Sequence, residues 1–324
     1  MPFTLSHPAA VLPLLRRPFV PVALVMGAMA PDVPYFLQTL RISVAAGDWY
    51  GPFLNATTSH SLTGVLTVTL PCTLVLVAGY WLLRGPVTGL LPARLVRPAP
   101  ALPNSAVARA HYGAWLLLSA LIGIATHLVW DSFTHFDGYV VDQVAFLREP
   151  VAGGLTPARL LQHLSTAIGL TVLGAHLWRR RVDRRTPRSA GSHALTPAIR
   201  WSVTAFLGGA ALLGAAAHSR GIDAHRQLTI VDTSRPLMTE LGDGATSITY
   251  PTRTEPAPWH TVAEGMLSDA AKGAGASLAA ALVLYAIAWH LHRVLRPSRR
   301  AGTEARPATA SVPGGSDTEK TMPS

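Results

Sequence analysis

Three potential metal ligands follow one another at four-residue spacing within residues 126–135, as His127, Asp131 and His135. On an α-helix, residues four apart lie about 40° apart around the axis, so these side chains share one face. The helical rise separates His127 from His135 by roughly 12 Å along that axis. A straight helix therefore cannot easily offer all three to one ion. Either His127 and Asp131 share an ion while His135 has another role, or two ions bind, or the helix bends.

Further ionisable side chains lie beside other apolar runs. Asp32 follows Pro31, His60 lies in Thr58-Ser59-His60-Ser61, and His163 lies in Gln162-His163-Leu164-Ser165. Imidazole and carboxylate ligands suit zinc or another divalent ion. The single cysteine, Cys72, excludes an intrachain disulfide and a cysteine-based zinc site.

These residues belong to a chain with a membrane composition. Of its 324 residues 49% are hydrophobic and only 14% are charged, against about 25% charged in ordinary soluble domains. Its net charge of +10 is clustered at the ends of apolar runs. Such clusters are typical of cytoplasmic loops and not of a nucleic-acid surface, so we expect no nucleic-acid partner.

The hydropathy pattern predicts an all-α, polytopic bundle of about six spans, preceded by a short helix within residues 1–17. The expected spans are residues 18–40, 62–83, 112–130, 160–178, 201–217 and 274–292. Arginine dominates residues 84–111 and 179–200 and follows the last span, whereas the other connections are mixed or acidic. The positive-inside rule then predicts a multi-pass cell-membrane protein with both termini cytoplasmic.

Four regions follow from this pattern. Residues 1–217 form the helix bundle with the candidate site, and residues 218–273 form an extramembrane loop or lid with strand-like pieces. Residues 274–296 are the last membrane helix, and residues 297–324 have the composition of a disordered tail.

With this topology His60, His127, Asp131, His135 and His163 lie at the outer ends of three consecutive spans, and Asp32 lies toward the same end of another. Ionisable groups at membrane depth normally face a polar cavity or a partner, so the convergence indicates a site. Each residue also has a simpler interpretation. His60 can be a helix-start residue, Asp32 a helix cap, and the His127/Asp131 pair a structural hydrogen bond.

The chain resembles the bacterial membrane family catalogued as domain of unknown function 4184. The resemblance lies in its opening Met-Pro-Phe-Thr-Leu-Ser-His-Pro-Ala, in Met29-Ala30-Pro31-Asp32, in Ser59-His60-Ser61 and in the stretches around His127 and His163. It is also similar to membrane-bound metal-dependent hydrolases of the LexA-binding inner-membrane type. That similarity implies metal ligation by five residues: His7, Asp32, His60, His127 and Asp131.

Two departures separate the chain from those hydrolases. It has Val33, Pro34 and Tyr35 where that group has a second Asp and a His, and it has no counterpart of the further His that precedes the Thr-His-Ser of that group. His135 and His163 either supply the missing ligands or act as general acid or base. His7 can reach the site only if the first short helix enters the bundle as a re-entrant element.

The sequence therefore favours a membrane metal-dependent hydrolase with a divalent ion, most simply zinc, near the outer leaflet. Water activated by the ion would attack a phosphoester, another ester or an amide of a lipid-like molecule, and His135 or His163 would protonate the leaving group. The alternative is a non-enzymatic membrane protein, either a metal or proton carrier or an assembly factor. Because the cytoplasmic halves of the spans carry almost no ionisable side chains, a carrier path is less favoured.

Overall fold

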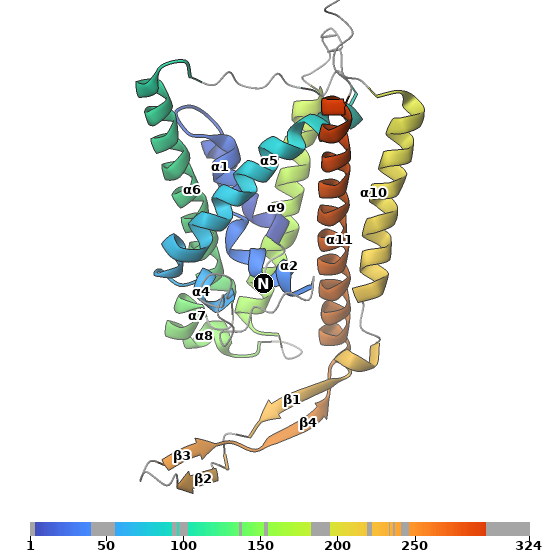
Figure 1. Cartoon of the computed structure of the whole chain (residues 1–324). Helices are drawn as coiled ribbons and strands as arrows, with labels where there is room; N and C mark the ends of the chain where they lie inside the picture. The colour runs from blue at the N-terminus through green and yellow to red at the C-terminus, as the bar shows by residue number, and fades with distance from the viewer. Residues whose placement is uncertain are drawn as a thin grey trace, which may run out of the picture. The chain divides into compact units, whose positions relative to one another are not determined.

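The protein is described from a computed structural model in which helices predominate (Figure 1). The described residues are 4–39, 56–92, 96, 103–135, 138–151, 155–182, 195–218, 222–232, 234–235, 237–240 and 246–295. The chain divides into a unit from Met1 to Ala286 and a short C-terminal unit from Ile287 onward, of which the last turns of a helix are described. The elements that form the candidate site lie in the first unit. The predicted tail, 297–324, lies outside the described residues.

Five segments are long and apolar enough to cross a membrane, which identifies a multi-pass membrane protein. They contain α5 (Leu70–Leu90), preceded by one π-helical stretch η3 (Val65–Thr69), then α6 (Ala106–Thr134), α9 (Pro157–Val182), α10 (Pro197–His218) and α11 (Trp259–Leu295). Local signals define their starts. The Ser105 hydroxyl accepts a hydrogen bond from the Ala108 amide and caps α6, while Pro71 lies in the first turn of α5.

The first predicted span, 18–40, is not one continuous helix. It is divided into α1 (Pro21–Gly27), the 3₁₀ turn η2 (Ala30–Asp32) and α2 (Val33–Thr39). Pro31 has no N–H group to continue the α1 ladder, and the Asp32 amide donates to the Met29 carbonyl instead. The Ala28 carbonyl is therefore not bonded by the amide four residues on.

Ahead of α1, the 3₁₀ helix η1 (Thr4–Leu14) packs against α9, α6 and α1. A turn that carries Arg16 and Arg17 then reverses the chain into α1. In Figure 1 this turn lies toward the end of the bundle at which α5 and α9 finish and α6 and α10 begin. The short N-terminal element is thus a re-entrant hairpin with α1, as the position of His7 required.

Two glycines allow α1 and α6 to pack closely. A Cβ atom on Gly123 of α6 would lie 2.3 Å from the Leu24 carbonyl oxygen, and one on Gly27 of α1 would lie 2.4 Å from the Ala120 carbonyl oxygen. Small residues at helix crossings of this kind let backbones approach in membrane proteins. The Val20 amide also donates to the Ser119 hydroxyl at 2.9 Å, which ties the start of α1 to the same face of α6.

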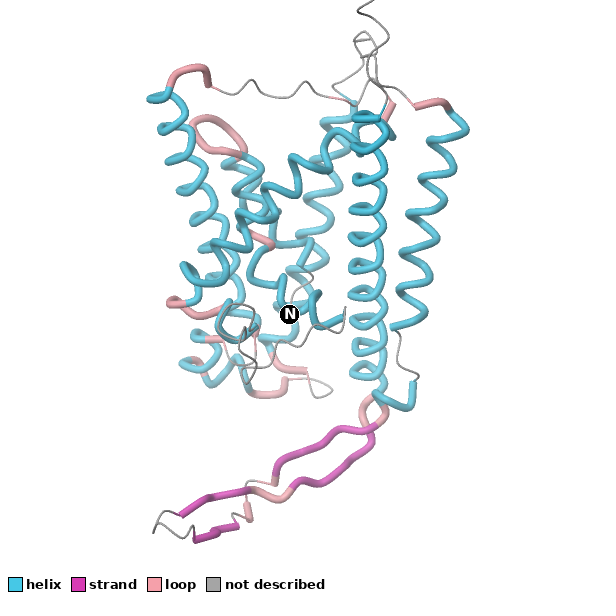
Figure 2. The backbone as a smooth tube through the Cα atoms, in the orientation of Figure 1, coloured by secondary structure: helices cyan, strands magenta, loops and turns pink. Residues whose placement is uncertain are grey.

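The remaining elements are short. Three helical pieces adjoin the site end of the bundle, namely α4 (Ala56–Ser59), α7 (Tyr139–Gln143) and α8 (Ala145–Arg148). Between α10 and α11 lie the turn η5 (Ile222–His225) and two antiparallel hairpins, which pair β1 (Gln227–Val231) with β4 (Thr252–Pro256) and β2 (Leu237–Glu240) with β3 (Thr246–Thr249). Figure 2 shows the strands in magenta beyond the helices. The last helix begins at Trp259, well before the predicted residue 274.

Candidate metal site

Six predicted side chains meet where η1, η2, α4 and the last turns of α6 come together. We call them the His/Asp cluster: His7, Asp32, His60, His127, Asp131 and His135. Within it, one donor atom each from Asp32, His60, His127 and Asp131 lies within 4.8 Å of the others, which makes a group able to hold a metal ion. We call these the four-ligand set. Asp32 and His127 are fully buried, and Asp131 is 5% exposed.

Four nitrogen–oxygen distances within the four-ligand set are narrowly distributed. His127 Nε2 lies 3.2 Å from Asp131 Oδ2 and 3.6 Å from Asp32 Oδ1. His60 Nε2 lies 3.5 Å from Asp131 Oδ2 and 3.6 Å from Asp32 Oδ1. Donors about 2.1 Å from a tetrahedral ion are separated by roughly 3.4 Å, so these four distances match edges of a zinc-type coordination tetrahedron.

The tautomer of His127 is determined by the broken first segment. Its Nδ1 lies 2.8 Å from the carbonyl oxygen of Ala28, the group that the helix break leaves unbonded by the Asp32 amide. Because a carbonyl only accepts, Nδ1 carries the proton and donates it. The Nε2 atom then presents its lone pair to the carboxylates of Asp32 and Asp131, unless the ring is an imidazolium.

His60 is oriented in the same way through Ser59. The Ser59 hydroxyl donates to the Pro31 carbonyl at 2.8 Å, so toward His60 Nδ1, at 3.1 Å, it can only accept. Nδ1 of His60 is therefore protonated and its Nε2 lone pair also faces the two carboxylates. The Thr69 hydroxyl, at the end of the π-helical stretch, donates to the Ser59 carbonyl at 2.7 Å and holds this residue in place.

Two buried carboxylates thus face two imidazole nitrogens, an arrangement that requires positive charge between them. Protonated rings would supply it through hydrogen bonds of about 2.7–2.9 Å, which is shorter than any of the four distances. Among the described residues, both carboxylate oxygens of Asp32, both of Asp131 and Nε2 of His127 have no hydrogen-bond partner. A divalent ion satisfies the distances and these buried atoms together. The donor set therefore fits a metal.

His7 extends the cluster from η1. Its ring stacks on that of His127, with centroids 3.9 Å apart, and its Nε2 lies 3.6 Å from Asp131 Oδ1. Burial, with a further contribution from His127, lowers the pKa of His7 from its ordinary 6.5 to about 4. A neutral His7 can act as a ligand or as a proton acceptor. Gly169 of α9 permits this placement, because a Cβ there would lie 2.9 Å from Cβ of Ser6.

His135 is the last of the three ionisable residues spaced four apart along α6. The helix finishes at Thr134, and His135 adopts an extended conformation (φ −84°, ψ 145°). Its Nε2 lies 3.3 Å from Oδ2 of Asp131, one helical turn earlier in the chain. With 20% of its side chain exposed, His135 lies at the rim of the cluster.

His163 pairs with a residue outside the cluster. Its Nε2 lies 2.8 Å from Oε1 of Glu264 on α11, and Arg159 pairs with the same carboxylate. Both α9 side chains line a neighbouring cavity. The metal-binding role of the five predicted ligands and the proton-transfer roles of His135 and His163 stay predictions.

Sequence reasoning missed the groups that orient the ligands and the partner of His163. Ser59 belongs to the Ser59-His60-Ser61 motif, but nothing in that motif indicates that its hydroxyl orients His60. The Ala28 carbonyl is a backbone group, so no side chain marks it. Glu264 did carry a signal, since it is an acidic residue on the helix that forms the last apolar span.

Comparisons with known proteins give one match. No curated protein and no solved structure matches the chain. The family model described as domain of unknown function (DUF4184) matches residues 1–287, which include the whole His/Asp cluster and every described helix except the last turns of α11. The chain therefore belongs to the DUF4184 family.

Proposed function

We propose that this protein is an integral membrane metal-dependent hydrolase, with zinc in the four-ligand set and a lipid-like phosphoester or other ester as substrate. The observation that carries the proposal is the pair of imidazole lone pairs directed at two buried carboxylates by Ala28 and Ser59. The sequence similarity to membrane metal-dependent hydrolases supports the reaction class.

The role of each residue in the proposed reaction follows from its position in the cluster. A divalent ion bound here would lower the pKa of water enough for attack on an ester near neutral pH. Oδ1 of Asp131 lies 3.6 Å from His7 Nε2 and its Oδ2 lies 3.3 Å from His135 Nε2, so these two imidazoles flank this ligand on its buried side and at the rim. His135, at the rim, is placed to protonate the leaving oxygen.

The position of the cluster supports a substrate that is reached from the membrane. Exposed aromatic residues Trp130, Tyr139 and Trp259 lie at the cluster's end of α6, in α7 and at the start of α11, whereas exposed Trp178 and Trp201 lie at the opposite end, in α9 and α10. Two such belts are typical of the two membrane interfaces. The arginine-rich end is the expected cytoplasmic side of the cell membrane, so the cluster would lie near the outer leaflet.

The test begins with the metal content of the detergent-purified protein. We expect about one zinc per chain in the parent protein and in His176→Ala, a variant of a half-buried histidine on α9 outside the cluster, and none in His127→Ala or Asp131→Ala. Equal zinc in all four proteins would refute the site. Turnover of a panel of lipid phosphates and esters, lost with chelator and restored by zinc, would separate an enzyme from a carrier or assembly factor. A zinc-loaded protein with no turnover would refute the hydrolase.

A further inference from the structure

A large cavity lies beside the His/Asp cluster. Its volume is about 860 Å³, within the range of pockets that hold small molecules. Two of its lining residues connect it to the cluster. Thr4 stands three residues before His7 on η1, and the ring of Tyr35 lies 6.0 Å, centroid to centroid, from that of His60. A molecule in the cavity would thus have one end near the four-ligand set.

The polar lining of this cavity has an excess of positive charge. Arg159 and Lys272 are cationic at neutral pH, and Glu264 is the only carboxylate among the residues that line it. Glu264 is already paired with Arg159 and His163. No carboxylate of the described residues forms an ion pair with Lys272. The cavity therefore favours an anionic group over a neutral or cationic one.

Another part of the lining is apolar. Phe36, Leu170, Leu228 and Leu267 contribute side chains from four different elements. An inorganic anion or a small polar ester would leave these walls in contact with water. An amphiphile would cover them with its tail while its head group met the cations.

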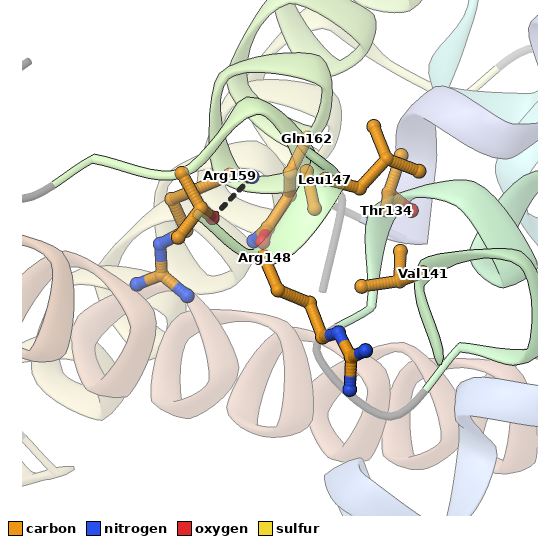
Figure 3. Close-up of a pocket in the computed structure, with 8 residues that line it drawn as sticks. Thr134, Val141, Leu147, Arg148, Arg159 and Gln162 are labelled. Atoms are coloured by element: carbon orange, nitrogen blue, oxygen red, sulfur yellow. Dashed lines mark hydrogen bonds between the residues drawn. The ribbon is translucent and has the colours of Figure 1, made fainter. Parts of the chain in front are cut away.

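A smaller pocket of about 80 Å³ adjoins this cavity, and Arg159 and Gln162 line both. In Figure 3 the Leu147 side chain lies beside Thr134 in this pocket, and the Arg148 guanidinium is directed away from both. The dashed bond joins the Arg159 amide to the Thr156 hydroxyl, at 3.3 Å. This bond anchors the first turn of α9, so Arg159 enters the large cavity from an ordered helix start.

We infer that this cavity binds the phosphate head group of a membrane amphiphile, with Lys272 and Arg159 as the recognising cations. The inference rests on the proposed function, since it names the substrate class for that site. Lys272 supplies the charge that no described carboxylate neutralises, and Arg159 supplies a planar donor set that fits phosphate oxygens.

Native mass spectrometry of the detergent-solubilised full chain tests this with three probes: dioleoyl phosphatidic acid, dioleoylglycerol and glycerol 3-phosphate. We expect phosphatidic acid to bind most tightly, because it alone offers both phosphate and tail. Lys272→Gln should weaken its binding about tenfold, the loss of one charge-assisted hydrogen bond. Lys272→Arg, which keeps the charge, should restore it. The control Arg226→Gln removes an exposed cation that pairs with Asp223 and does not line the cavity.

Several results would overturn the inference. Dioleoylglycerol bound as tightly as phosphatidic acid would show that phosphate is not recognised. Glycerol 3-phosphate bound as tightly would show a soluble phosphate site. Equal losses in Lys272→Gln and Arg226→Gln would show a general charge effect. Because the readout is binding and is measured in the presence of chelator, its failure leaves the metal and turnover tests of the proposed function intact.

Discussion

Substitution of Gly123 by alanine should weaken metal binding without touching any ligand. The added Cβ would lie 2.3 Å from the Leu24 carbonyl oxygen and 2.9 Å from the Ala28 amide nitrogen. Both are backbone atoms, so no side chain can rotate away. An ordinary carbon–oxygen contact is about 3.3 Å, which means that α1 must move from α6 by about 1 Å.

That displacement would lengthen the hydrogen bond that orients the His127 ring. The His127 Nδ1 to Ala28 oxygen distance is 2.8 Å, and about 1 Å more would exceed hydrogen-bonding range. Loss of such a partner typically lowers metal affinity about 10–100-fold. The overpacking itself should destabilise the protein by about 1–3 kcal/mol.

The assay is zinc affinity by competition with a chromophoric chelator, together with thermal unfolding of the detergent-solubilised protein. Gly113→Ala is the matched control, because Gly113 is on the same helix and an added Cβ there meets nothing within 4 Å. This control should keep its zinc affinity and gain slightly in stability from helix propensity. If Gly123→Ala binds zinc as tightly as Gly113→Ala, then the α1–α6 contact does not orient the imidazole and the reasoning is wrong.

Three further substitutions test other parts of the site. Ser59→Ala removes the hydroxyl that accepts from His60 and orients its ring, so zinc affinity should fall about 10–100-fold. The control Ser132→Ala loses a hydrogen bond within its own helix and should leave zinc affinity unchanged. Gly169→Ala should displace η1 and lower the melting temperature measured by thermal unfolding, whereas Gly174→Ala on the same helix, with open space at its Cβ, should not. Glu264→Gln should destabilise the protein by about 1–3 kcal/mol in denaturant titration, because Arg159 and His163 lose the carboxylate with which both pair. An unchanged midpoint would show that these pairs contribute nothing.

The metal site could be predicted from sequence to the extent that local spacing determines it. The shared face of His127 and Asp131 follows from helical periodicity, and both residues contribute to the four-ligand set. The polytopic helical fold follows from apolar runs of the right length. The four-residue spacing also accounts for the contact of His135 with Asp131, whereas the end of α6 did not follow, because no Gly or Pro marks Thr134 as the last helical residue.

Contacts between segments far apart in the sequence could not be predicted from residue spacing or hydropathy, for another reason. The pairing of His163 with Glu264 joins residues 101 positions apart, and that of His127 with Ala28 joins residues 99 positions apart. Neither partner belongs to a periodic motif. The Ala28 contact also involves a backbone carbonyl, which every residue possesses, so no side-chain pattern can single it out.

The break in the first apolar segment explains why so many ligands converge in a helical membrane protein. An unbroken span would bond its carbonyls internally and leave none for other helices. Pro31 prevents this, and the consequences follow in order: Ala28 is free to accept from His127, Pro31 accepts from Ser59, and Asp32 projects between the two imidazoles. The same short segment thus supplies one ligand and anchors the groups that orient two others. Irregular backbone at membrane depth is tolerated where it is buried in protein, and here it forms the base of the candidate metal site.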